Sequence, residues 1–171
     1  ALREKSLWIT RKLDESRERQ QRQHEARIDW RDGVVLPLFG KPIRVVLDPG
    51  HAFGAVGAQL EPMEPHDGSE GVDVVARVLH VGLPTTATPE QIRDAVQAWL
   101  MRQAREHFKE RLDHFAPLLQ VQWRKLSLSS AGTRWGSARI DGAIRLNWRL
   151  IHLRPTVIDY VVAHELSHLR V

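Results

Sequence analysis

The chain contains no cysteine. This absence excludes disulfides, thiol catalysis and cysteine-rich zinc fingers, and it leaves histidine and carboxylate side chains as the metal ligands that the protein can offer. The sequence also lacks the apolar core of a signal peptide and any apolar run of membrane-spanning length. Because neither segment is visible, and because the absence of cysteine fits a reducing compartment, we expect a cytoplasmic protein with no membrane partner.

The chain also has little excess charge and lacks several catalytic signatures. The net charge is +4 and the sequence pI about 10.0, a mild basic excess that permits contact with nucleic acid without strongly favouring it. We find no glycine-rich phosphate loop, no nucleophile elbow and no internal repeat. With 171 residues, of which 42% are apolar and 27% charged, the composition is that of an ordinary globular chain, most simply a single domain.

One short segment near the end of the sequence carries a chemical signature. His164-Glu165-Leu166-Ser167-His168 matches the pattern H-E-x-x-H. On an α-helix, residues four apart lie one turn apart on the same face, so two imidazoles can converge on one metal ion at the distances that zinc prefers. Glu165 follows the first of these histidines, where it can accept a proton from a water activated by zinc. The motif predicts His164 and His168 as metal ligands and Glu165 as the catalytic residue.

The sequence around the motif is typical of a helix. Pro155 suits the first helical position, and the residues from there to Val171 include no further proline and no glycine. Val157, Val161, His164 and His168 form one helical stripe, which predicts that the histidines continue an apolar, inward-facing surface. The alternative is a pair of core histidines bonded to backbone carbonyls, but Glu165 has no structural reason to lie between them.

The remaining elements are less specific. Thr88 and Pro89 are an N-cap and a first helical residue, and they predict a long helix that ends at Pro117. The other expected elements are a helical extension over 1–30, a hairpin of strands 34–39 and 43–47, a glycine- and proline-rich loop over 48–73, and strands over 74–81, 121–128 and from 144. This order predicts an α+β fold in which helices pack on a small, mostly antiparallel sheet.

Three blocks of residues, in this order, resemble the YgjP-like metallopeptidase family, which is related to the SprT-like and WLM zinc peptidases. The blocks are Arg134-Trp135-Gly136-Ser137, Ile144-Arg145-Leu146-Asn147-Trp148-Arg149-Leu150, and the segment from Val157 to Leu169 that contains the histidine motif. The firm part of the resemblance covers 126–171, which we expect to hold the metal site within a single metallopeptidase-like domain over 1–171.

The resemblance implies a zincin-like, minimal gluzincin core. It implies that His164 and His168 hold Zn²⁺, that Glu165 is the catalytic carboxylate, and that a third ligand is a histidine shortly after the motif, beyond Val171. The family usually has a cysteine after the serine of the tryptophan loop, whereas this chain has Ala138. A thiol role at that position is therefore absent.

Residues that flank the motif have simpler expected roles. Trp135 and Trp148 are expected to pack beneath the helix that carries the histidine motif. Arg134 and Asn147 have two open roles, either orienting a ligand or substrate carbonyl or making hydrogen bonds that stabilise a turn. Asp159 is expected to be an early-helix charge that favours the positive end of the helix dipole.

These observations leave two functions in competition. The first is a zinc-dependent peptidase that acts on a peptide or protein substrate, with Glu165 as general base. The second is a non-catalytic metal-binding module that engages nucleic acid or a protein partner. The intact Glu165 favours catalysis, because a purely structural site needs no general base.

Overall fold

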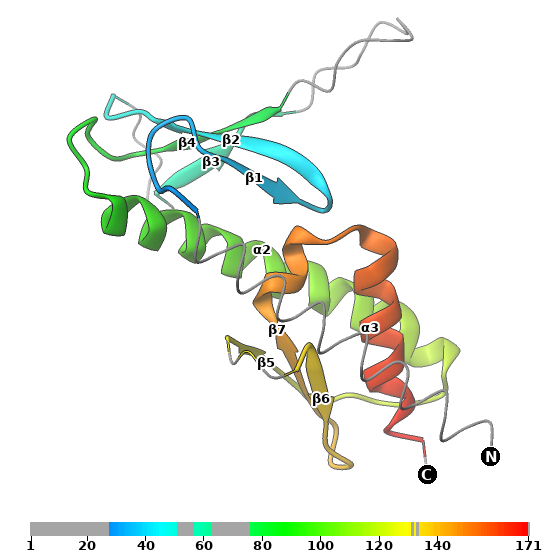
Figure 1. The fold of residues 1–171 in the computed structure, drawn as a ribbon. Coiled ribbons are helices and arrows are strands. Elements are labelled where there is room, and N and C mark those ends of the chain that lie inside the picture. Colours follow the sequence, from blue (N-terminus) through cyan, green and yellow to red (C-terminus); the bar gives the residue numbers. More distant parts are fainter. Residues whose placement is uncertain (1–27, 51–56, 63–75, 131, 133, 171) are drawn as a thin grey trace, which may run out of the picture. The chain divides into compact units, whose positions relative to one another are not determined.

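The computed structural model describes residues 28–50, 57–62, 76–130, 132 and 134–170 (Figure 1). The helical extension predicted over 1–30 lies almost entirely outside these residues. The described chain forms two compact units. The N-terminal unit comprises 29–103 and 151–155, and the C-terminal unit comprises 104–150 and the residues from 156 onward.

The N-terminal unit is built on a four-stranded sheet with the order β1-β2-β4-β3. Its strands are β1 (Val35–Leu38), β2 (Lys41–Leu47), β3 (Ala58–Leu60) and β4 (Arg77–Val81). The predicted hairpin is confirmed, because β1 and β2 pair antiparallel around a tight turn at Phe39 and Gly40, which both have positive φ angles. The buried side chains of these strands include Leu36, Ile43 and Leu79.

One expectation for this unit held only in part, and another was wrong. Strands β2 and β4 pair parallel, with Val45 opposite Leu79, so the sheet is mixed, although two of its three pairings are antiparallel. The long connection between them permits a parallel pairing, which a tight turn cannot. The segment predicted as a loop over 48–73 contains β3, which pairs antiparallel with β4 at the edge of the sheet.

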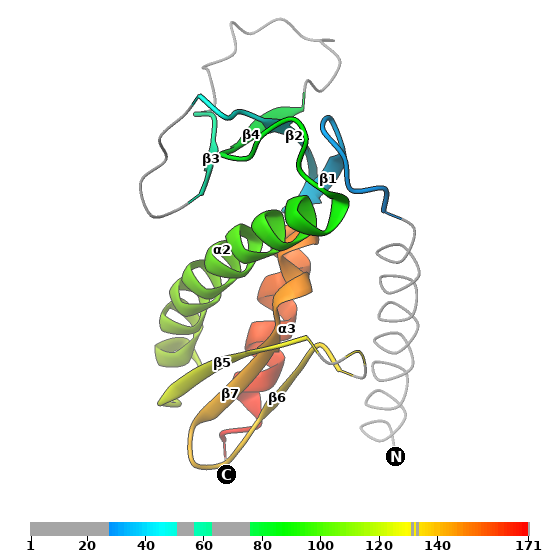
Figure 2. The ribbon, with the colours of Figure 1, turned by 90° about the vertical axis from the view of Figure 1, so that its left-hand side faces the viewer.

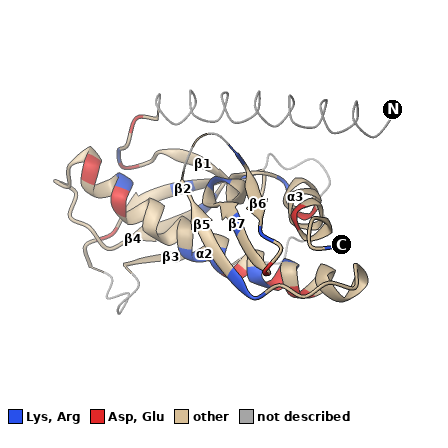
Figure 3. Ribbon diagram, turned by 90° about the horizontal axis from the view of Figure 1, so that it is seen from below, with Lys and Arg blue, Asp and Glu red and all other residues tan. Residues whose placement is uncertain are grey.

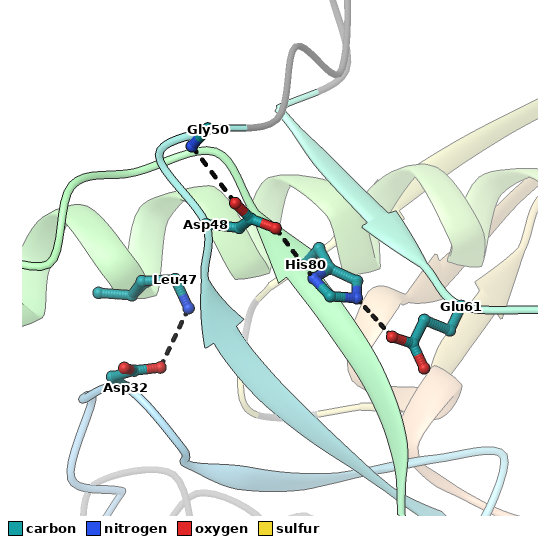
Figure 4. Close-up of polar contacts among 6 residues, drawn as sticks. All are labelled: Asp32, Leu47, Asp48, Gly50, Glu61 and His80. Carbon is teal, nitrogen blue, oxygen red and sulfur yellow. Dashed lines mark hydrogen bonds and ion pairs between the residues drawn. The ribbon is translucent and has the colours of Figure 1, made fainter.

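A histidine between two carboxylates joins the ends of three strands in this sheet (Figure 4). His80 Nε2 lies 2.6 Å from Glu61 Oε1, and His80 Nδ1 lies 3.4 Å from Asp48 Oδ2. Asp48 follows β2 and Glu61 follows β3, whereas His80 belongs to β4. The carboxylates approach opposite nitrogens of the ring, so the three side chains do not converge on one point. We read the cluster as a polar clamp that ties the strand ends together.

The C-terminal unit contains a second, three-stranded sheet with the order β5-β7-β6. Its strands are β5 (Lys125–Ser129), β6 (Gly136–Ala138) and β7 (Ala143–Asn147). Strand β7 pairs parallel with β5 and antiparallel with β6, so this sheet is mixed as well. The α+β class is confirmed, but the single, mostly antiparallel sheet is replaced by two small mixed sheets within the described residues.

The long helix α2 (Pro89–Leu118) begins where the sequence predicts. Thr88 Oγ1 accepts a hydrogen bond from the backbone N–H of Gln91, and Gln91 Oε1 accepts one from the N–H of Thr88, which is a capping box. The helix continues one residue past Pro117, contrary to prediction. It ends where Gln120 adopts a φ of 57° and the N–H of Val121 bonds to the carbonyl of Ala116.

A short 3₁₀ helix, η2 (Trp148–His152), leads to the helix α3 (Pro155–Ser167). Helix α3 begins at Pro155, as predicted. In the C-terminal unit, α3 covers one face of the sheet β5-β7-β6, as Figure 2 shows behind the strands. The core of this unit consists of fully buried side chains from the sheet, from α3 and from the second half of α2, namely Phe108, Leu112, Ile144, Leu146, Ile158, Val162 and Leu166.

Candidate metal centre

Helix α3 carries His164 and Glu165 of the histidine motif, and His168 follows one residue past its end. Its buried face is formed by Ile158, Val161, Val162, Glu165 and Leu166. His164 is half-buried and His168 is exposed. The expectation that both histidines lie on the inward-facing stripe was therefore wrong, because the buried stripe passes through Glu165. An exposed His168 also does not fit the alternative of two core histidines.

The two imidazoles nevertheless converge. The Nε2 atoms of His164 and His168 lie 3.3 Å apart, and the rings are nearly perpendicular, with an interplanar angle of 89°. Two imidazole nitrogens bound to one tetrahedral zinc at about 2.0–2.1 Å are separated by about 3.3–3.4 Å. The spacing of these two nitrogen atoms therefore fits a shared zinc ion.

The end of α3 sets the position of the second histidine. The helix proper ends at Ser167, and the N–H of His168 bonds to the carbonyl of Glu165, three residues back. This bond tightens the last turn into 3₁₀ geometry, which is common at helix C-termini. His168 thus lies in a well-defined final turn, one residue past the helix.

The side chain of Glu165, a residue of α3, points from the helix toward β6, which is an edge strand of the sheet. It is 7% exposed. Gly136, the first residue of β6, faces it so closely that a Cβ atom added there would lie 3.1 Å from Glu165 Cγ and 2.9 Å from Leu146 Cδ2. Any larger residue at position 136 would therefore force these neighbours to shift, and glycine lets β6 approach the helix closely at this point.

Tyr160 was not singled out by the sequence, yet it extends the exposed side of the motif. Its ring stacks on that of His164, with centroids 6.1 Å apart and an interplanar angle of 20°. Tyr160, His164 and His168 follow one another at intervals of four residues, which is the signal that identifies them as one helical face. The side chain of Tyr160 is 52% exposed, so it leaves one ring face open to solvent beside the histidines.

An ion pair holds the N-terminal half of α3 against α2. Arg111 Nε lies 2.7 Å from Asp159 Oδ1, and Arg111 Nη2 lies 3.1 Å from Asp159 Oδ2. The expectation that Asp159 is only a charge near the helix N-terminus was therefore incomplete. Arg111 also lies over the ring of Phe115, 5.1 Å from its centroid. This bidentate contact fixes the helix that carries the motif.

His107 lies near this ion pair on α2. Burial lowers the pKa of His107, and the nearby cation of Arg111 acts in the same direction. The carboxylates of Glu110 and Asp159 oppose this shift. The structure thus favours the neutral form of His107, which matters for the pH dependence of folding.

The predictions for the residues that flank the motif are confirmed in part. Trp135 and Trp148 are buried, as expected for packing residues. The side-chain oxygen of Asn147 accepts a hydrogen bond from the N–H of Arg149 at 3.0 Å, which stabilises the start of η2. Arg134 is exposed just before β6. A role for Arg134 or Asn147 in orienting a ligand or substrate stays a prediction.

Two histidines do not make a complete zinc site. In the part of the chain that the structure describes, no group of three or more histidine, aspartate and glutamate side chains is placed to hold a metal ion. Zinc hydrolases normally offer three protein ligands and keep one position open. The third ligand expected beyond Val171 stays a prediction.

The buried glutamate and the two converging imidazoles are side chains of the kinds that metal-dependent hydrolases use. The sequence profile of the YgjP-like metallopeptidase domain matches residues 1–171, and the chain therefore belongs to this family. The resemblance carried by the three sequence blocks is confirmed. No curated protein and no solved structure matches the chain. Among the described helices, none combines the length and the apolar character needed to cross a membrane.

Proposed function

We propose that the protein is a zinc-dependent peptidase, with His164 and His168 as metal ligands and Glu165 as general base. The observation that carries this proposal is the 3.3 Å separation of the two Nε2 atoms, which matches the separation of two nitrogens on one tetrahedral zinc ion. Membership of a metallopeptidase family supports the same chemistry.

The chemistry that zinc supplies when bound is Lewis-acid polarisation of the scissile carbonyl. The chain's own contribution is proton transfer. Glu165 accepts a proton from the attacking water and later donates it to the leaving amine. The low exposure of Glu165, 7%, keeps competing water away from this carboxylate.

Strand β6 offers a place for the substrate backbone. It is an edge strand of the described sheet, paired on one side with β7. In an antiparallel pair the backbone groups alternate in direction. Ser137 of β6 lies opposite Arg145 of β7. The N–H of Asn147 donates a hydrogen bond to the carbonyl of Trp135, and the N–H of Arg139 donates one to the carbonyl of Ala143. The N–H and C=O groups of Gly136 and Ala138, which lie between these bonded positions, therefore point to the open edge. A peptide added as a strand there passes beside Glu165, which Gly136 faces.

The substitution Glu165→Gln tests this proposal, because it keeps the size of the side chain and removes its basicity. We expect the variant to bind zinc like the parent protein and to lose peptide hydrolysis by at least about 100-fold, the range of general-base contributions. Glu110→Gln is the matched control, since Glu110 is an exposed glutamate on α2 in the same unit. Hydrolysis that survives in zinc-loaded Glu165→Gln would exclude this mechanism.

The competing function is a non-catalytic metal-binding module that engages nucleic acid or a protein partner. The observation that favours it is the excess of basic over acidic residues in 119–150, the segment that contains the C-terminal sheet, whose ribbon carries blue segments in Figure 3. Binding to DNA that weakens steeply with rising salt, in a protein that binds zinc but cleaves no peptide, would support this function over the peptidase.

A further inference from the structure

The sheet of the C-terminal unit has an unbalanced charge. Residues 119–150 contain six basic side chains and one acidic side chain, Asp141, which gives a net charge of about +5 in this segment of the sequence. The basic residues are Arg124, Lys125, Arg134, Arg139, Arg145 and Arg149. Figure 3 shows blue segments on the ribbon of this sheet. Since the whole chain carries only +4, the excess is concentrated here.

The strand register places three of these cations on one face. Arg145, in the central strand β7, lies opposite Ser127 of β5 and Ser137 of β6. In the next row, Lys125 of β5 lies opposite Ala143, whose carbonyl accepts a hydrogen bond from the N–H of Arg139. Residues directly opposite one another share a face, and so do residues two apart along a strand. We call Lys125, Arg139 and Arg145, with Ser127 and Ser137, the basic face.

The other side of the sheet is apolar. Ile144 and Leu146 of β7 are buried, and Gly136 of β6 faces Glu165. The basic face is therefore the side turned away from α3. Lys125, Arg139 and Arg145 are all exposed.

Little in the described chain neutralises the basic face. Arg139 Nη2 lies 3.1 Å from Asp141 Oδ2, but the two side chains are 77% and 53% exposed. Such exposed pairs are weak and easily exchanged for another partner. Among the described residues, neither Lys125 nor Arg145 forms an ion pair. Charge complementarity thus points to an anionic partner on this face.

We propose that the basic face selects peptide substrates that carry acidic side chains at alternate positions. This inference rests on the proposed function, in which the substrate is added as a strand to β6. Side chains of such a strand alternate between the two faces of the sheet. One set points toward Glu165 and the scissile region. The other set lies beside Ser137 and Arg139, with Arg145 one strand further away, where a carboxylate gains from these cations.

The size of the preference follows from the exposure of the cations. An exposed ion pair changes an equilibrium by about 1.4- to 5-fold, so two acidic side chains spaced two residues apart favour binding by about 2- to 25-fold at low salt. The preference declines as the ionic strength rises toward 1 M, because the Debye length falls to about 3 Å. A preference that depends on shape alone has no such salt dependence.

The experiment measures binding of fluorescent peptides to zinc-loaded Glu165→Gln in the full-length protein, so that it does not require catalysis. Each peptide of the set carries two glutamates, two residues apart, and the position of this pair moves along the peptide from one member to the next. The affinity of each peptide is compared with that of an otherwise identical peptide in which both glutamates are glutamine. We expect the best glutamate peptide to bind at least about 2-fold more tightly at low salt. Arg145→Gln and Arg139→Gln reduce this ratio toward one, whereas Arg44→Gln, an exposed arginine on strand β2 of the other sheet, preserves it.

The outcomes separate this inference from the proposed function. Equal binding of glutamate and glutamine peptides overturns the inference, whether or not the parent protein hydrolyses peptides. An acidic preference that Arg145→Gln and Arg139→Gln leave intact overturns it too. Single-stranded DNA that displaces the acidic peptide at lower concentration, with a steep salt dependence that both arginine variants reduce, assigns the face to nucleic acid instead. Failure of the proposed function itself appears separately, as equal hydrolysis by the parent protein and Glu165→Gln.

Discussion

Replacing Gly136 by alanine tests how closely strand β6 must approach the side chain of Glu165. Gly136 does not have a positive φ angle, so alanine is allowed there by the backbone and the effect is purely steric. The new Cβ would lie 2.9 Å from Leu146 Cδ2, 3.1 Å from the carbonyl oxygen of Arg145 and 3.1 Å from Glu165 Cγ. All three contacts involve the backbone of the central strand or a buried side chain, which have little room to move.

Overpacking of this kind costs about 1–3 kcal/mol. For a chain of this size, such a loss lowers Tm by about 2–12 °C. Because the displaced atom belongs to Glu165, the general base that we propose, we expect hydrolysis of peptides by the folded variant to fall more than the loss of stability explains. Thermal unfolding and kcat/KM, measured well below Tm, report the two effects.

Gly50→Ala is the matched control for this substitution. Among the described residues, its Cβ would meet Asp48 Oδ1 alone, at an ordinary contact distance of 3.7 Å, and Gly50 also does not have a positive φ. We expect a change in stability within about 0.5 kcal/mol and unchanged hydrolysis. If Gly136→Ala is as stable and as active as the parent protein, the close packing of β6 on Glu165 is wrong.

Three further predictions concern the elements that hold the site. A double-mutant cycle with Arg111→Gln and Asp159→Asn should give a coupling free energy of about 1–3 kcal/mol in denaturant unfolding, and a coupling near zero would contradict the bidentate pair. The lowered pKa of His107 means that the unfolded chain binds more protons near the ordinary value of 6.5, so stability is fully present above pH 6.5 and declines as the pH falls toward the folded pKa. His107→Gln should flatten this decline in unfolding curves measured from pH 7.5 to 5, and an identical slope in the variant would refute the assignment. Thr88→Ala should cost about 0.5–2 kcal/mol through loss of the cap of α2, and a neutral result would show that the cap contributes nothing.

Local signals in the sequence located the elements well. Thr88 and Pro89 mark the start of α2, and Pro155 marks the start of α3, because capping and proline geometry depend on a few neighbouring residues. The hairpin of β1 and β2 was predictable for the same reason, since a short turn around Gly40 joins two apolar strands.

Features that depend on distant residues were not predictable. Strand β6 has the composition of a turn, Gly-Ser-Ala, and it is a strand because β7 pairs with it. The parallel pairing of β2 with β4 and the contact of Arg111 with Asp159, 48 residues apart, also leave no local trace. In such cases tertiary context overrides local propensity.

The histidine motif shows the same limit at the site. Helical periodicity predicts that His164 and His168 share a face, and the 3.3 Å separation of their Nε2 atoms agrees with that spacing. Periodicity alone does not determine which face of the helix is buried. The three-dimensional packing buries Glu165 and leaves His168 exposed.

The zinc content of the purified full-length protein, measured by elemental analysis after zinc loading and removal of free metal, tests whether His164 and His168 bind a metal ion. We expect about one zinc per chain, as in single-site zinc hydrolases, and a large loss in both His164→Ala and His168→Ala. His114→Ala, an exposed histidine on α2, should keep the parent zinc content. A parent protein without zinc, or zinc retained in full by both motif variants, would contradict the proposed metal site.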